Sequence, residues 1–289
     1  MIALHSPRLS AEINPQGAEL HALRDSEGRD LLWSGDPAVW SGRAPVLFPI
    51  VGALNQDRYR WHGQTYTLPK HGFARRRLFQ VIHSDPSSAT LRLDWDEQTF
   101  AAYPFQFQLD LRFALDGATL SMTATIRNLD RRTPLWASFG FHPALVWPLP
   151  YGQAKAGHSL TFAQPEPAPI RRIDAAGLLR PAPEPSPVQG RELMLNSALF
   201  EDDAIIFDRL ASRALSYGAG GGPGLDIAFP DTGLLGVWQK PGADYICIEP
   251  WRGIADPEGF DGELSDKPGM MQIAPDQAAR CTMSVTLRG

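Results

Sequence analysis

Strict alternation of apolar and mostly polar residues constrains this chain more than any other feature. In FQFQLDLRFAL, residues 105–115, every second residue is apolar, and the same period returns in residues 120–126 after the turn Asp116-Gly117. Side chains of a β-strand point to opposite faces in turn, so this period is typical of a strand that is buried on one face. The two stretches are therefore predicted to form a β-hairpin.

Similar alternation occurs in residues 90–94 and 283–287, and 26 glycines and 26 prolines interrupt the chain too often for long helices. Strands that are buried on one face need a second layer, which sheets stacked face to face provide. The chain has 289 residues, of which 43% are hydrophobic, so it can bury a substantial core. We predict an all-β fold of stacked, mainly antiparallel sheets.

A proline-rich segment bears on the number of domains. Residues 164–189 contain seven prolines: Pro165, Pro167, Pro169, Pro181, Pro183, Pro185 and Pro187. Such a segment is either an interdomain linker or an extended excursion over one sandwich. Strand-like alternation resumes afterwards and neither half looks self-contained, so we favour the excursion and predict a single domain over residues 1–289.

Charge and composition restrict the partners and the compartment. The formal net charge of -5 disfavours a polyanion, so we expect no nucleic-acid partner. No basic stretch leads into an apolar segment at the start, and nothing approaches the roughly 20 apolar residues of a membrane span. We expect a cytoplasmic protein without membrane contact. Cys247 and Cys281 lack metal-like pairing and are predicted to be reduced core thiols.

Several motifs that would carry other chemistry are incomplete. The glycine-rich YGAGGGPGL, residues 217–225, lacks the spacing of a phosphate loop and is predicted to be a hairpin loop. The acidic DPEGFDGELSD, residues 256–266, has Phe260 where a calcium loop needs an oxygen ligand, so a solvated turn is favoured. No GxSxG or HExxH motif is present.

Three polar islands remain in apolar, aromatic settings, and they centre on His71, His142 and Glu249. A lone histidine next to glycine or proline is more often a satisfied structural residue. Glu249 is harder to dismiss, because it follows four apolar residues and precedes Pro250-Trp251, where a carboxylate is partly desolvated and a better base. A carboxylate base and an imidazole acid on opposite sides of a pocket, with tryptophan nearby, suit a sugar.

These islands and their surroundings resemble the aldose 1-epimerase (galactose mutarotase-like) family, and within it the bacterial LacX-like branch. The resemblance covers nearly the whole chain in the expected order, from Leu31 to Gly269. The segments that carry it are LLWSGDPAVWSGRAPVLFPIVG, YTLPKHGFAR, FHPAL, LFEDDAIIF and CIEPWRGIADPEGFDGELSDKPG. It implies a β-supersandwich, an active site in a cleft on one sheet, and interconversion of α- and β-anomers without a cofactor or metal.

The resemblance also implies roles for individual residues. Glu249 takes the place of the base that removes the proton from the C1 hydroxyl, and His142 the place of the acid that protonates the ring oxygen. His71 corresponds to a second histidine that holds sugar oxygens, and Asp203 to a hydroxyl-binding acid, although Asp202 is adjacent.

Arg43 and Arg75 fall on motif positions that face the cleft in relatives, and we expect Trp251 to contact the sugar. In one departure from the pattern, Ala53 stands where relatives often carry arginine. This departure puts one sugar contact in doubt.

Two other functions stay open. Arg75-Arg76-Arg77 would suit the phosphate of a hexose 6-phosphate, although on a strand at most Arg75 and Arg77 share a face. A non-catalytic carbohydrate-binding protein on the same fold is the other alternative. We favour an aldose 1-epimerase that acts on a free hexose, as a monomer or homodimer.

Overall fold

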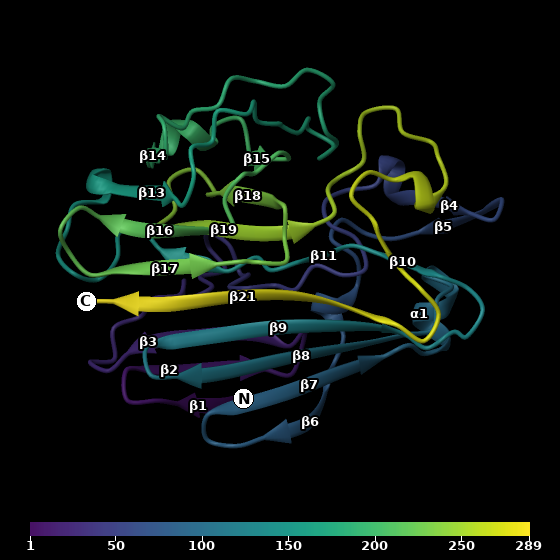
Figure 1. Cartoon of the computed structure of the whole chain (residues 1–289), viewed down its shortest axis with the longest axis horizontal. Coiled ribbons are helices and arrows are strands. Elements are labelled where there is room, and N and C mark those ends of the chain that lie inside the picture. The colour runs from purple at the N-terminus through teal and green to yellow at the C-terminus, as the bar shows by residue number, and fades with distance from the viewer.

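The computed structural model describes residues 1–289, and strands dominate it (Figure 1). Its largest unit is a nine-stranded antiparallel sheet with the strand order β14-β13-β16-β17-β21-β9-β8-β7-β6. The strands of this sheet are β6 (Gln80–Ser84), β7 (Ser88–Asp94), β8 (Phe107–Asp116), β9 (Thr119–Asn128), β13 (His158–Phe162), β14 (Glu192–Met194), β16 (Ala214–Ala219), β17 (Gly224–Ala228) and β21 (Ala278–Arg288).

A second sheet of five strands positions the candidate site. Its order is β11-β19-β18-β15, and β12 also pairs with β19. These strands are β11 (Phe139–Gly140), β12 (Ala144–Val146), β15 (Ile205–Phe207), β18 (Leu234–Trp238) and β19 (Tyr245–Arg252).

Smaller elements complete the fold. A three-stranded sheet contains β1 (Ile2–His5), β2 (Leu9–Asn14) and β3 (Glu19–Asp25), and two further pairs are β4 (Arg58–Trp61) with β5 (Gln64–Thr67) and β10 (Leu135–Ala137) with β20 (Met271–Ile273). The helical segments are α1 (Glu97–Ala102) and the 3₁₀ turns η1 (Asn55–Asp57), η2 (Ala74–Arg76), η3 (Lys155–Gly157), η4 (Ser197–Phe200) and η5 (Leu264–Asp266).

The predicted hairpin is confirmed as β8 and β9, which pair from Phe107↔Asn128 to Asp116↔Thr119. The alternation in residues 90–94 and 283–287 lies in β7 and β21, and the glycine-rich loop connects β16 to β17. Every second residue of β8 is buried, as the period of its sequence requires. Each fully buried leucine or phenylalanine stabilises the fold by about 1.5–3 kcal/mol.

The two large sheets share one hydrophobic core, so the predicted class of stacked antiparallel sheets is confirmed. Leu109 and Leu111 of β8 belong to the same buried cluster as Ile246 and Ile248 of β19. Since side chains alternate along a strand, the residues between these isoleucines project from the opposite face of the five-stranded sheet. That opposite face carries the candidate site.

The proline-rich segment packs along this second sheet. Arg171 forms an antiparallel bridge with Ile206 of β15, and Ile170 forms another with Glu184 inside the segment. Both cysteines are buried and unpaired, as expected. None of the helices combines the length and the apolar character needed to cross a membrane.

Candidate active site

A cavity of about 240 Å³ lies over the outer face of the five-stranded sheet. Its lining includes six of the residues singled out from the sequence: His71, Arg75, His142, Asp203, Glu249 and Trp251. They come from segments between residues 71 and 251, so the fold brings the three polar islands to one place. Arg43 is the only predicted site residue that is absent from the lining.

The alternation of side chains along β19 places the carboxyl of Glu249 at the cavity. Ile246 and Ile248 point into the main core, whereas Glu249 and Trp251 line the cavity. Both of these cavity residues are nearly inaccessible to solvent, with 2% and 5% exposure. The buried strand therefore presents an ionisable group to an enclosed space, where its charged form is disfavoured.

Two glycines make room for the ring of Trp251. A Cβ atom at Gly236 of β18 would lie 2.4 Å from this ring, and one at Gly140 of β11 would lie 2.6 Å from it. Any side chain at either position would therefore displace the indole. The ring rests on the two strands as an apolar wall of the cavity. Burial raises the pKa of the neighbouring Glu249 carboxyl, and the indole N–H acts to lower it.

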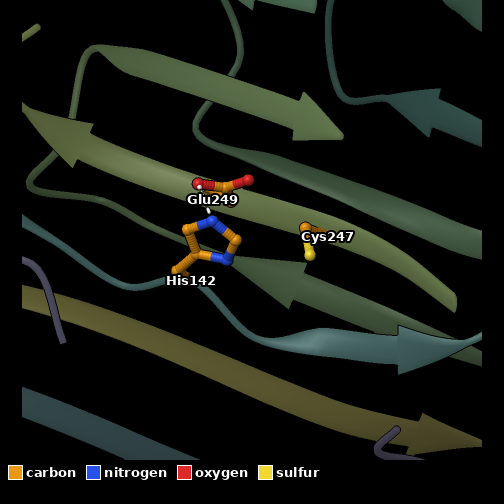
Figure 2. Close-up of side chains that lie close together, drawn as sticks. All are labelled: His142, Cys247 and Glu249. Carbon is orange, nitrogen blue, oxygen red and sulfur yellow. Dashed lines mark ion pairs between the residues drawn. The ribbon is translucent and has the colours of Figure 1, made fainter. Parts of the chain in front are cut away.

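The imidazole of His142 contacts the carboxyl of Glu249, with 3.1 Å between Nε2 and Oε2 (Figure 2). The expectation that these groups face each other across the pocket is therefore wrong. They are adjacent because β11 and β12 both pair with β19, in the registers Gly140↔Trp251 and Ala144↔Cys247, which carries the intervening His142 opposite Glu249. The rings of Trp40 and Trp238 lie 5.5 and 6.1 Å from the imidazole and enclose the pair.

Burial determines how this pair holds its protons. Desolvation raises the pKa of the Glu249 carboxyl well above its usual range, and the charge of Asp203 acts in the same direction. Desolvation also lowers the pKa of the His142 imidazole. Both shifts favour the neutral forms of the two groups. Burial therefore disfavours the carboxylate and the imidazolium that the expected acid–base roles require.

His71 is held in one tautomer. Its Nδ1 accepts a hydrogen bond from the backbone N–H of Gly52 at 3.1 Å, so the ring proton of the neutral imidazole is on Nε2. Burial lowers the pKa of His71 well below its usual value and keeps the ring neutral. The next residue must be glycine, because a Cβ at Gly72 would lie 2.3 Å from the carbonyl oxygen of Phe48. His71 therefore presents an N–H donor at the cavity.

The structure separates the two neighbouring aspartates. Asp202 accepts two hydrogen bonds of 2.6 Å from Arg180 and is half-exposed. Asp203 has a positive φ of 60° and lines the cavity. Asp203 is therefore the aspartate that is available to a ligand, as the sequence analysis favoured.

Two of the predictions about the arginines are wrong. Arg75 and Arg76 lie in the 3₁₀ turn η2, so the strand geometry assumed for Arg75-Arg76-Arg77 is wrong. Arg75 lines the cavity with a buried Nε that has no partner, whereas Arg77 forms an ion pair with Asp96. Arg43 lies outside the cavity lining because its Nη1 donates to the carbonyl oxygen of His21 at 2.7 Å.

Sequence reasoning missed Lys70, Trp40 and Trp238, which also line the cavity. Lys70 and Ala53 lie beside Gly177 of the proline-rich segment, where an added Cβ would be 3.6 Å from Lys70 Nζ and 3.3 Å from Ala53 Cβ. The place of Lys70 directly before His71 was the available signal.

The acidic segment 256–266 is not simply a solvated turn. Asp256 is 2% exposed and accepts a hydrogen bond of 2.7 Å from Lys267, which is also buried. Its second oxygen accepts the backbone N–H of Asn55 at 2.9 Å. The ion pair closes the segment between β19 and β20, and the bond from Asn55 joins this segment to the one that contains Gly52; Gly52 and Ala255 line the cavity.

One set of donors has the spacing of metal ligands. Atoms of His142, Cys247 and Glu249 lie within 4.8 Å of one another (Figure 2). Burial raises the pKa of the Cys247 thiol well above its usual value, which disfavours the thiolate that a metal requires. The direct contact between His142 and Glu249 already pairs the other two donors.

Comparisons with known proteins bear on the family and the fold. The family described as Aldose 1-epimerase matches residues 1–257. The chain is 29% identical over 295 residues to Protein LacX of Lactococcus lactis subsp. lactis, with 99% of both chains covered. A galactose mutarotase related enzyme from Lactobacillus acidophilus superposes with a TM-score of 0.91 at 28% identity, over 99% of this chain and 97% of that one. A galactose mutarotase-like protein from Lactobacillus casei gives 0.92 at 26% identity, with both chains fully covered.

Proposed function

The chain belongs to the aldose 1-epimerase family, and from this premise we propose that it interconverts the α- and β-anomers of a free hexose by acid–base ring opening and reclosure. The observation that carries the proposal is the buried contact between His142 and Glu249 inside a cavity of about 240 Å³. Pockets for drug-sized ligands occupy roughly 300–1,000 Å³, so this smaller cavity suits a monosaccharide.

The adjacency of the two groups fits the chemistry of a hemiacetal. The hydroxyl oxygen O1 and the ring oxygen are bonded to the same carbon, so a base for one and an acid for the other must also be neighbours. Glu249 takes the proton of O1 while His142 donates a proton to the ring oxygen. The bond between C1 and the ring oxygen breaks, and an open aldehyde with a new hydroxyl remains.

In the opening step Glu249 gains the proton of O1 and His142 gives its proton to the ring oxygen, so the pair carries one proton before and after the step. The ring opens with a carboxylate and an imidazolium, and the open aldehyde faces a neutral carboxyl and a neutral imidazole. Burial favours that neutral form, so the environment of the pair stabilises the state that accompanies the open sugar. Rotation about the C1–C2 bond, followed by the reverse proton transfers, closes the ring as the other anomer.

The remaining cavity residues supply sugar contacts. The Nε2–H of His71 and the carboxylate of Asp203 bind hydroxyl groups of the sugar. The indole rings pack on the C–H face of the sugar. Lys70 and Arg75 are the cations in the lining of the cavity. The formal net charge of -5 disfavours an anionic substrate, so a free hexose is proposed in preference to a hexose 6-phosphate.

Polarimetry of freshly dissolved α-anomers tests the proposal. We expect the protein to accelerate the approach to anomeric equilibrium for glucose or galactose, and to act less well on glucose 6-phosphate. Acceleration only for the phosphorylated sugar would favour the hexose-6-phosphate alternative. Binding of sugars without acceleration for any of them would favour a carbohydrate-binding protein.

A further inference from the structure

Two arginines of the proline-rich segment form hydrogen bonds with the loop that contains Asp203. Arg172 is buried, with 7% exposure, and reaches the loop formed by residues 199–203. Its Nη2 donates to the carbonyl oxygen of Leu199 at 3.0 Å, and its Nη1 donates to that of Asp203 at 2.9 Å. A guanidinium that is buried among backbone carbonyls fixes the path of the loop, because each lost bond would leave a buried polar atom unpaired.

Arg180 holds the same loop from outside. Its two terminal nitrogens each lie 2.6 Å from one carboxylate oxygen of Asp202, which is the geometry of a bidentate ion pair. Glu184 lies 3.7 Å from Arg180 and 3.5 Å from Arg172, so it links the two arginines. Residues 172 to 184 therefore form one clamp on the loop.

The clamped loop has a conformation that a free chain would rarely adopt. Asp203 has a φ of 60°, in the left-handed region that non-glycine residues seldom occupy. Its Oδ1 accepts the backbone N–H of Ala204 at 2.7 Å, which orients the carboxylate relative to the cavity. Such a backbone persists only where its surroundings hold it. Here the two arginines and the bond from the N–H of Ala204 contribute to holding it.

We propose that Arg172 and Arg180 are positioning residues, which hold the Asp203 carboxylate toward the sugar and thereby set affinity and discrimination at one hydroxyl group. The inference rests on the proposed function, in which Asp203 binds a sugar hydroxyl. It gives the proline-rich segment a role in substrate recognition. Ile173 and Gly177 of the same segment line the cavity directly.

The test is Arg180→Met, because this side chain is 35% exposed and its loss does not open the core. We expect KM and the Kd from calorimetric titration with the hexose to rise about three- to tenfold, while kcat changes by less than about twofold. Asp202→Asn breaks the same ion pair from the other partner and should give the same result. Asp203→Asn should weaken binding by about tenfold.

Double variants separate positioning from general stability. Arg180→Met added to Asp203→Asn should cause no further change, because the arginine acts only through that carboxylate. A monodeoxyhexose that lacks the hydroxyl bound by Asp203 should be insensitive to Arg180→Met. Arg92→Met is the matched control, since Arg92 forms a similar bidentate pair with Asp110 on the nine-stranded sheet and should leave KM unchanged.

Three results would overturn the inference: an unchanged KM and Kd in both Arg180→Met and Asp202→Asn, full additivity with Asp203→Asn, or an equal effect of Arg92→Met. These outcomes differ from a failure of the proposed function. In that case the unaltered protein itself would not accelerate mutarotation.

Discussion

Replacing Glu249 by glutamine removes the proposed base while keeping its shape. The carboxyl is 2% exposed and lies 3.1 Å from His142, so bulk water does not replace it as the proton acceptor. Positioned acid–base groups contribute about 10²- to 10⁴-fold, so kcat should fall by this factor, or about 2.7–5.5 kcal/mol in the barrier. KM should change little, because the amide still fills the site and bonds to the imidazole.

Polarimetry over a range of hexose concentrations gives both constants, and denaturant unfolding checks the fold. Glu166→Gln is a matched control, because Glu166 is also 2% exposed but accepts the backbone N–H groups of Ala211 and Ser212 away from the cavity. That variant should lose stability and keep kcat. The reasoning is refuted if Glu249→Gln raises KM and leaves kcat intact, because Glu249 would then bind the sugar without transferring a proton.

Three further predictions follow from the cavity and its walls. At pH values above the lowered pKa of His142 and below the raised pKa of Glu249, the pair carries one proton. A plot of kcat against pH should therefore be flat in this range. Its acidic limb should lie below the ordinary imidazole pKa of 6.5. An acidic limb at or above that value would contradict it. Lys70→Met removes a positive charge that lowers both pKa values, so both limbs should move to higher pH, whereas Lys70→Arg should leave them in place. Lys267→Met leaves the buried Asp256 carboxylate unpaired and should lower the free energy of unfolding by about 3–5 kcal/mol. Urea titration should show partial recovery in the double variant with Asp256→Asn, and equal stability of the single and double variants would argue against a buried charge.

The sequence predicted those strands and segments whose residues show a local pattern of apolar and polar side chains. The alternation of β8 and β9 follows from side-chain period alone. The buried strand that leads to Glu249 is also visible in the sequence, but it continues through Pro250 to Arg252 instead of ending at Glu249. The proline-rich excursion was favoured because strand-like alternation resumes after it. Each of these features is visible within a window of ten or twenty residues.

Long-range pairing accounts for only part of what the sequence did not predict. The contact between His142 and Glu249 depends on the register of β11 and β12 against β19, more than 100 residues away. Asp256 is buried together with Lys267, and nothing in the residues around Lys267 indicates that this lysine side chain is buried. The turn η2 was mistaken for a strand, because three consecutive arginines contain no periodicity to decide between them.

Exchange NMR at anomeric equilibrium tests the central claim most directly, because it measures interconversion without any coupled reaction. Saturation of the α-anomeric proton of a hexose should be transferred to the β-anomeric proton in the presence of the protein. The transfer rate should rise in proportion to protein concentration and should fall by about 10² or more in Glu249→Gln and in His142→Asn. An exchange rate that is the same with and without the protein, for every hexose and hexose phosphate tried, would contradict the assignment of an epimerase.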